Sequence, residues 1–203
     1  MAYLDNVKIS VARRGQYTKE IPLIKAMLDY GSYAQQYFDY NVEKLANGGK
    51  HLGETSISSV TASTLAELYD KNTLKKGSND ITLAAASLVL ESHTRLRFYL
   101  DIPKLDSGRL VVKYINNGTE KDVVETGERN GKYYIDPTDI LPQDLTKNVT
   151  VKISSGDDSV TVTYNCMAYA HSVLLSDKTS KELRDVVCAL YLYSIAASGY
   201  IGS

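Results

Sequence analysis

The chain has 203 residues, with 23 basic and 24 acidic side chains, 16 Tyr, two Phe and no Trp. A chain of this length buries about 70% of its unfolded surface, so it needs neither metals nor disulfides to fold. Because the charges nearly cancel and neither sign forms a long run, the composition argues against a nucleic-acid partner. The apolar part of the last predicted helix is shorter than the ~20 residues that span a bilayer, so we expect no membrane insertion. The start has no basic and then apolar leader, so no signal peptide is predicted.

A long first helix is predicted over residues 19–46. Its apolar and small residues recur at steps of three and four, which is the spacing of one buried helix face. The residues on this face are Ile24, Met27, Leu28, Gly31, Ala34, Gln35 and Phe38. Asn47-Gly48-Gly49 then ends the helical region. Such a stripe requires an apolar partner.

The partner is predicted at the other end of the chain, in a helix over residues 180–200. Thr179 and Glu182 stand three residues apart before it, as in a capping box. The same helical spacing relates Leu183, Val186, Val187, Leu190, Ser194 and Ala197. Nearly every residue from 186 to 201 is apolar or small, so we expect this helix to be covered on more than one side. We predict that the two helices pack as an antiparallel or crossed pair.

The middle of the chain, about residues 81–164, is predicted to form a β-rich core. Short alternating runs are separated by turn residues, and this pattern is typical of hairpins. After the first hairpin, strands are expected at 110–115, 122–126, 132–135, 149–153 and 160–164. The predicted fold is α+β, with antiparallel β-sandwich-like sheets and an N-terminal and a C-terminal helix packed together. No internal repeat or long linker is found, so we expect one module over residues 1–203.

The first hairpin is predicted from residues 84–91 and 95–100, which both alternate between apolar and polar side chains. A turn with an odd number of residues, here residues 92–94, keeps both apolar sets on one face. This register places Val89 opposite Arg97 and Glu91 opposite Arg95.

The outer face of this hairpin supplies the candidate ligand-binding residues. They combine charged, aromatic and imidazole groups: Glu91, His93, Arg95, Arg97 and Tyr99. Together these groups suit a carboxylate or a network of sugar hydroxyls, but a solvated sheet face is the favoured interpretation. The many tyrosines leave two interpretations open as well, either the half-wet rim of a thin core or a sugar- or peptide-binding face.

No sequence pattern indicates a catalytic, metal or cofactor site. His51, His93 and His171 lack the spacing of a helical zinc site, and no nucleophile elbow or phosphate-binding glycine loop is present. Cys166 and Cys188 lie in apolar surroundings, which favours two buried thiols over a disulfide. We therefore expect no enzyme activity, no metal and no cofactor.

Three segments resemble a repeated accessory module of large secreted or cell-wall-attached proteins of gut Clostridia. The shared motifs are a YGxxAQxYF helix, an ASLxLESxTxLRxY strand pair and a closing helix similar to LRDLVKALYLYNKAA, found here at residues 30–38, 86–99 and 183–197. This chain departs from the module at Asp29, Ser32, His93 and Cys188. The resemblance implies an extracellular or cell-wall-attached location and neighbouring domains of a larger surface protein as partners.

The sequence thus predicts a non-enzymatic accessory module that acts as a spacer or protein-interaction domain. The alternative is a carbohydrate-binding module that uses exposed tyrosines, with a glycan in place of another surface protein as the partner. A hydrolase is a third hypothesis and requires a cleft with two convergent carboxylates.

Overall fold

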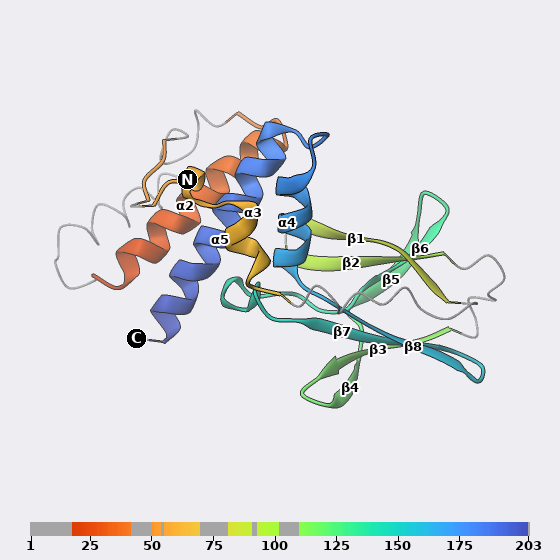
Figure 1. Cartoon of the computed structure of the whole chain (residues 1–203). Coiled ribbons are helices and arrows are strands. Elements are labelled where there is room, and N and C mark those ends of the chain that lie inside the picture. The colour runs from red at the N-terminus through yellow and green to blue at the C-terminus, as the bar shows by residue number, and fades with distance from the viewer. Residues whose placement is uncertain are drawn as a thin grey trace. The chain divides into compact units, whose positions relative to one another are not determined.

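The structure, a computed structural model, describes residues 18–41, 50–53, 55–69, 81–90, 93–101 and 110–202. These residues form two compact units, which are coloured along the chain in Figure 1. The first unit holds the described residues up to Leu65, Pro142–Leu145, and those from Ala170 onward. The second holds those within Ala66–Leu141 and Thr146–Tyr169. The prediction of one module over residues 1–203 stays a prediction.

The first unit is built on helices α2 (Glu20–Tyr37) and α5 (Lys181–Ile201), which lie along each other. The ring of Tyr30 stacks on that of Tyr193, with 5.7 Å between centroids. Burial, and next the nearby Asp185 carboxylate, raise the pKa of Tyr33, one turn further along α2, so later residues of α2 lie beside earlier residues of α5 and the pair is antiparallel. The smaller elements of this unit are the short helices η2 (Ile57–Ser59) and η4 (Pro142–Asp144), which both contact α5. The predicted packing of the terminal helices is confirmed.

Helix α2 is shorter than predicted, because it ends at Tyr37 and not at residue 46. The Phe38 amide caps it by donating to Ala34 O, and Asp39 then adopts a left-handed conformation at φ 58° that breaks the helical path. Phe38 is 40% exposed, so its placement on the buried face was wrong. Residues 42–46 of the predicted helix lie outside the described residues.

Helix α5 agrees with its prediction, apart from its cap. Ser180 and not Thr179 is the N-cap, and its hydroxyl accepts from the Leu183 amide at 3.2 Å. All residues from 186 to 190 are buried, which confirms that this helix is covered on more than one side. Cys188 is among them; it and Cys166 are free thiols, and burial raises the pKa of Cys188 to about 11.

The second unit contains two four-stranded antiparallel sheets. One sheet has the order β1-β2-β6-β5 and the other has the order β4-β3-β7-β8. The strands are β1 (Thr82–Leu90), β2 (Thr94–Asp101), β3 (Leu110–Asn116), β4 (Thr119–Asp122), β5 (Glu125–Arg129), β6 (Lys132–Asp136), β7 (Val149–Ser155) and β8 (Asp158–Tyr164). Helix α3 (Ala62–Ala66) ends at the start of this unit, and α4 (Cys166–Leu175) begins in it.

Asn-Gly turns fix two of the hairpins. Asn117-Gly118 and Asn130-Gly131 all have positive φ, as the tight primed turns of hairpins require. The chain therefore turns at residues 117–118, and β4 pairs with β3 directly afterwards. The predicted strand at 122–126 was wrong, because β4 ends at Asp122 and β5 begins at Glu125.

The β1–β2 hairpin has the predicted faces but a different register. Val89 pairs with Arg95 instead of Arg97, and Leu90 pairs with Thr94, which belongs to β2 and not to the turn. The number of turn residues stays odd, so the apolar residues of both strands still share a face.

The core of the second unit lies between apolar faces of the two sheets. Leu96, Phe98, Leu100 and Ile135 are buried in the first sheet, and Val149, Val151, Ile153 and Val162 in the second. The rings of Phe98 and Tyr164 meet edge to face across these faces, 6.4 Å apart. The predicted α+β fold with sandwich-like sheets is confirmed.

Candidate functional site

The first candidate site is a charged network on the opposite face of the first sheet, across β2, β6 and β5. Pairing of β2 with β6 brings Arg97 beside Asp136, which is fully buried. The Arg97 guanidinium donates from Nε to Asp136 Oδ1 at 2.7 Å and from Nη2 to Oδ2 at 2.6 Å. The hydrogen bonds to this carboxylate raise the pKa of Arg97. The pair is a bidentate, buried ion pair.

The rest of the network closes around this pair. Arg97 lies 3.9 Å from the ring centroid of Tyr134, whose hydroxyl donates to Glu125 Oε1 at 2.7 Å. Arg95 donates to Glu125 Oε2 at 3.0 Å and to Asp139 Oδ1 at 2.6 Å. The hydrogen bond from Tyr134 lowers the pKa of Glu125. Each charged group here therefore already has a partner of opposite charge.

The structure brings most of the predicted ligand-binding residues to this face, although not in a free state. Arg95, Arg97 and the half-buried Tyr99 alternate along β2, and Arg97 also hydrogen bonds to Tyr99. His93 is 57% exposed, and its Nδ1 lies 3.6 Å from Asp139 Oδ2. Glu91 lies outside the described residues. Sequence reasoning missed the acidic partners, because they arrive from β5, β6 and the segment after it.

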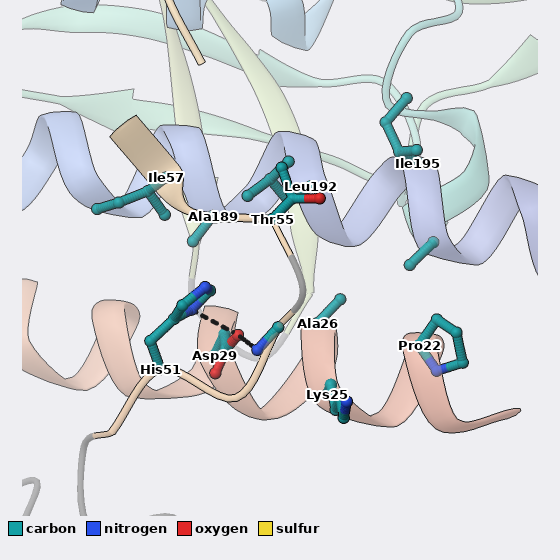
Figure 2. A pocket seen from close by; sticks show the side chains of 12 residues that line it. Pro22, Lys25, Ala26, Asp29, His51, Thr55, Ile57, Ala189, Leu192 and Ile195 are labelled. Carbon is teal, nitrogen blue, oxygen red and sulfur yellow. Dashed lines mark hydrogen bonds and ion pairs between the residues drawn. The ribbon is translucent and has the colours of Figure 1, made fainter. Parts of the chain in front are cut away.

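The second candidate site is a cavity of about 200 Å³ between α2 and α5, with residues 51, 53, 55 and 57 also in its lining. Figure 2 shows the wall that α5 contributes, facing the residues of α2. Most of the lining is apolar: Pro22, Ala26, Ile57, Ala189, Leu192 and Ile195. The exposed residues Pro22 and Ile195 lie toward solvent. Its polar lining residues include Lys25, Asp29, His51 and Thr55.

Asp29 organises the polar corner of this cavity. Asp29 is 5% exposed; its carboxylate accepts hydrogen bonds from Leu52 N at 2.7 Å and from Gly53 N at 2.6 Å, and its Oδ2 lies 2.8 Å from His51 Nδ1. A Cβ on Gly53 would stand 2.8 Å from Asp29 Oδ2, so the close approach requires glycine. The carboxylate thus ties a distant loop to α2 and orients an imidazole.

The orientation of His51 leaves one ring nitrogen available. Oδ2 of Asp29 lies 2.8 Å from Nδ1, a distance at which a nitrogen lone pair would be repelled by the carboxylate, so in the neutral imidazole the proton belongs on Nδ1 and Nε2 is an acceptor. No hydrogen bond to Nε2 is made by the residues that the structure describes, and the side chain is 31% exposed. A carboxylate that holds Nδ1 is also the arrangement that histidine bases use, so this corner can accept a hydrogen bond or a proton. No sequence pattern predicted this corner, because Asp29 and His51 are 22 positions apart.

Three further observations concern the expected classes of site. Within the described ranges, no three His, Cys, Asp or Glu side chains gather as metal ligands. No helix among the residues placed in the structure is long and apolar enough to cross a bilayer. The most exposed tyrosines in those residues, Tyr37, Tyr40 and Tyr200, lie at the ends of α2 and α5 and not on the hairpin face.

Comparisons with protein-family models, with curated proteins and with solved structures find no match for this chain.

Proposed function

We propose that the chain is a non-enzymatic interaction module that binds by receiving an apolar side chain of a partner protein in the cavity between α2 and α5. The single observation that carries this proposal is the cavity itself, a concave and mostly apolar site with a small number of fixed polar groups. Sites of this composition are typical of ligand recognition. By contrast, the charged and polar groups of the network on β2, β6 and β5 hydrogen bond to one another.

The size of the cavity suits one side chain. A cavity of roughly 150 Å³ with aliphatic walls accepts benzene, so about 200 Å³ accommodates a ring with one or two further atoms. The lining carries one cationic residue, Lys25, and one anionic residue, Asp29, so it favours a neutral group. An aromatic or branched side chain meets these conditions.

The extracellular and multidomain setting is part of the proposal and rests on the resemblance of the three segments. In that setting, the partner is a neighbouring domain or another surface protein. A module of this kind needs a binding site and no reacting groups.

The proposal is tested by titrating the full chain with Ac-Gly-Phe-Gly-NH₂ and with Ac-Gly-Ala-Gly-NH₂, observed through ¹³C-methyl resonances. We expect the Phe peptide to move the methyl signals of Ala26, Ala189, Leu192 and Ile195 with a Kd in the millimolar range, since a single side chain offers few atoms. The Ala peptide should leave these signals in place. The absence of any saturable shift with the Phe peptide would contradict the proposal.

A matched pair of variants locates the binding. Ala196→Leu adds three carbons to the cavity wall, and we expect it to weaken the Phe peptide at least about tenfold. Gly199→Leu adds a side chain to an exposed position of the same helix, where a Cβ meets nothing within 4 Å. Equal binding to both variants would place the peptide elsewhere.

A second candidate function, carbohydrate binding, is favoured by a different observation. Tyr37, Phe38 and Tyr40 are exposed together at the end of α2, with 5.0 and 6.3 Å between successive ring centroids. Their planes differ by 64° and 39°, so they suit a single sugar chain better than a flat polysaccharide surface. On a glycan array, binding that Tyr40→Ala abolishes and Tyr200→Ala preserves would support this function. An array without any signal would remove it.

A further inference from the structure

At the Asp29–His51 corner, the mostly apolar cavity also holds an imidazole that a buried carboxylate keeps in place. Asp29 fixes both the position and the tautomer of His51, and the remaining acceptor Nε2 belongs to a side chain that lines the cavity. Figure 2 shows His51 beside Asp29 at one end of the lining residues, with Pro22 and Ile195 toward the other. A ligand that fills the apolar part can therefore place its tip at this imidazole.

We propose that this cavity selects a neutral hydrogen-bond donor on an aromatic body, namely a phenolic hydroxyl of the tyrosine type, which donates to His51 Nε2. The inference rests on the proposed function and names the ligand class of the same site. The tyrosine side chain is a ring with two further atoms, Cβ and Oη, which is within the size that the cavity accommodates. Its hydroxyl supplies the donor that the apolar walls lack.

The charges of the lining argue for a hydroxyl over an ammonium group. The Asp29 carboxylate already accepts hydrogen bonds from two backbone amides and contacts His51 Nδ1 at 2.8 Å, so few of its lone pairs are available to a ligand cation. Lys25 brings a positive charge to the same lining and repels a second one. A ligand carboxylate could meet Lys25, but at the His51 end of the cavity it would stand against the Asp29 carboxylate, where the Nδ1 proton of the neutral imidazole faces Asp29.

The test compares Ac-Gly-Tyr-Gly-NH₂ with Ac-Gly-Phe-Gly-NH₂, which differ only in the hydroxyl. We expect the Tyr peptide to bind roughly three- to tenfold more tightly, which is the usual contribution of one hydrogen bond. In the variant His51→Phe this preference should disappear while the Phe peptide still binds. His93→Phe, at an exposed histidine outside the cavity, should retain the preference.

The outcomes separate the two proposals. If neither peptide binds, the proposed function fails and this inference falls with it. If both bind equally, the cavity is a binding site without the hydroxyl preference, and only this inference is overturned. A Tyr preference that survives in His51→Phe also overturns it.

A second measurement covers the case in which His51→Phe does not fold. Long-range ¹H–¹⁵N correlation on the unaltered chain reports which imidazole nitrogen carries the lone pair. We expect that nitrogen to be Nε2 and its resonance to shift with p-cresol and not with the isosteric p-xylene. A shift of equal size with both probes, or a proton on Nε2 in the neutral form, would overturn the inference. Tighter binding of the Tyr peptide than of p-cresol supports a partner's tyrosine as the source, and the reverse supports a free phenol.

Discussion

Two buried carboxylates in this chain are both held by nitrogen donors, but they differ in whether the groups around them can still bind a ligand. Asp136 on β6 is paired with Arg97, and the groups around that pair bond to one another. Asp29 on α2 is also held by strong donors, but the imidazole that it orients keeps one nitrogen unpaired within the described part of the chain. We call the Asp136 arrangement closed, because its groups bond to one another, and the Asp29 arrangement open, because His51 Nε2 can still accept a hydrogen bond.

This difference separates a structural network from a candidate binding site more clearly than residue type does. Arginines, carboxylates and a tyrosine gather on the sheet, and such a set is common in binding sites. Their hydrogen-bonding capacity is used internally, so a ligand would have to break existing pairs. At the cavity, a ligand gains a hydrogen bond in exchange for bonds to water and breaks none between the residues that the structure describes.

The largest effect is expected from breaking the closed network at its centre. Asp136→Ala leaves the Arg97 guanidinium, which is 7% exposed, without its buried counter-ion. We expect a loss of about 3–5 kcal/mol in the free energy of unfolding, because an uncompensated buried charge is costly. Urea denaturation measures the loss. Glu120→Ala removes the exposed ion pair with Lys152 and should cost far less, because water screens an exposed pair.

The double variant Arg97→Met/Asp136→Leu sharpens this prediction. Replacing both charges by apolar side chains of similar volume should recover most of the lost stability, since no charge is then left unpaired. If the double variant is as unstable as Asp136→Ala, the cost arises from packing and not from the orphaned guanidinium.

A smaller effect is expected from breaking the open site at Asp29. Asp29→Ala removes the acceptor of the Leu52 and Gly53 amides, and we expect a loss of about 1–3 kcal/mol, because nearby water can replace part of the lost bonding. Hydrogen exchange should accelerate at these two amides. Asp177→Ala, at an exposed turn of the same unit, is the control. Unchanged exchange at Leu52 and Gly53 would contradict the role of Asp29 as the anchor.

Much of the fold was predictable because its signals are local. The helical spacing of residues 183–197 predicted a helix covered on several sides, and alternation predicted that Leu96, Phe98 and Leu100 share a buried face. The predicted register of β1 against β2 was wrong by one position on each strand. A shift of one position on both strands keeps the same side chains on the same face, so the alternation could not distinguish the two registers. Local pattern thus determined the faces and left the pairing open.

The candidate sites were much less predictable because they depend on contacts between distant segments. Arg97 meets Asp136 only through the pairing of β2 with β6, and no pattern in either strand specifies its neighbour. Asp29 was visible only as a charged residue beside the apolar stripe of α2. Its role follows from a loop of residues 50–53 that returns to the helix.

A Gly→Ala substitution beside each site tests how much room that site has for one added methyl group. A Cβ on Gly53 would lie 2.8 Å from Asp29 Oδ2, and one on Gly127 would lie 2.9 Å from the ring of Tyr134. We expect Gly53→Ala and Gly127→Ala each to cost about 1–2 kcal/mol through local shifts. Gly31→Ala, on α2 with nothing within 4 Å, should instead stabilise the chain by up to about 1 kcal/mol. Thermal unfolding ranks the three variants, and a stabilised Gly127→Ala would show that Tyr134 moves freely.

The smallest effect concerns the pH dependence of the closed network at Glu125. The hydrogen bond from Tyr134, and next that from Arg95, lower the pKa of this carboxyl in the folded state. A lowered folded pKa stabilises the fold above the unfolded value of about 4.3, and this contribution is lost as pH falls through the folded pKa. Glu125→Gln should therefore flatten the stability curve within that acidic window and leave its slope near neutral pH unchanged.

The two partners of Glu125 can be separated by titrating its carboxyl carbon by NMR. Because the Tyr134 hydroxyl and the Arg95 guanidinium both lower this pKa, Tyr134→Phe and Arg95→Gln should each raise the pKa of Glu125, and the larger rise identifies the stronger partner. Tyr134→Phe keeps the ring on Arg97, so the Arg97–Asp136 pair remains and the change reports the hydroxyl alone. A larger rise with Arg95→Gln would mean that the ion pair and not the hydroxyl bond secures this edge of the network.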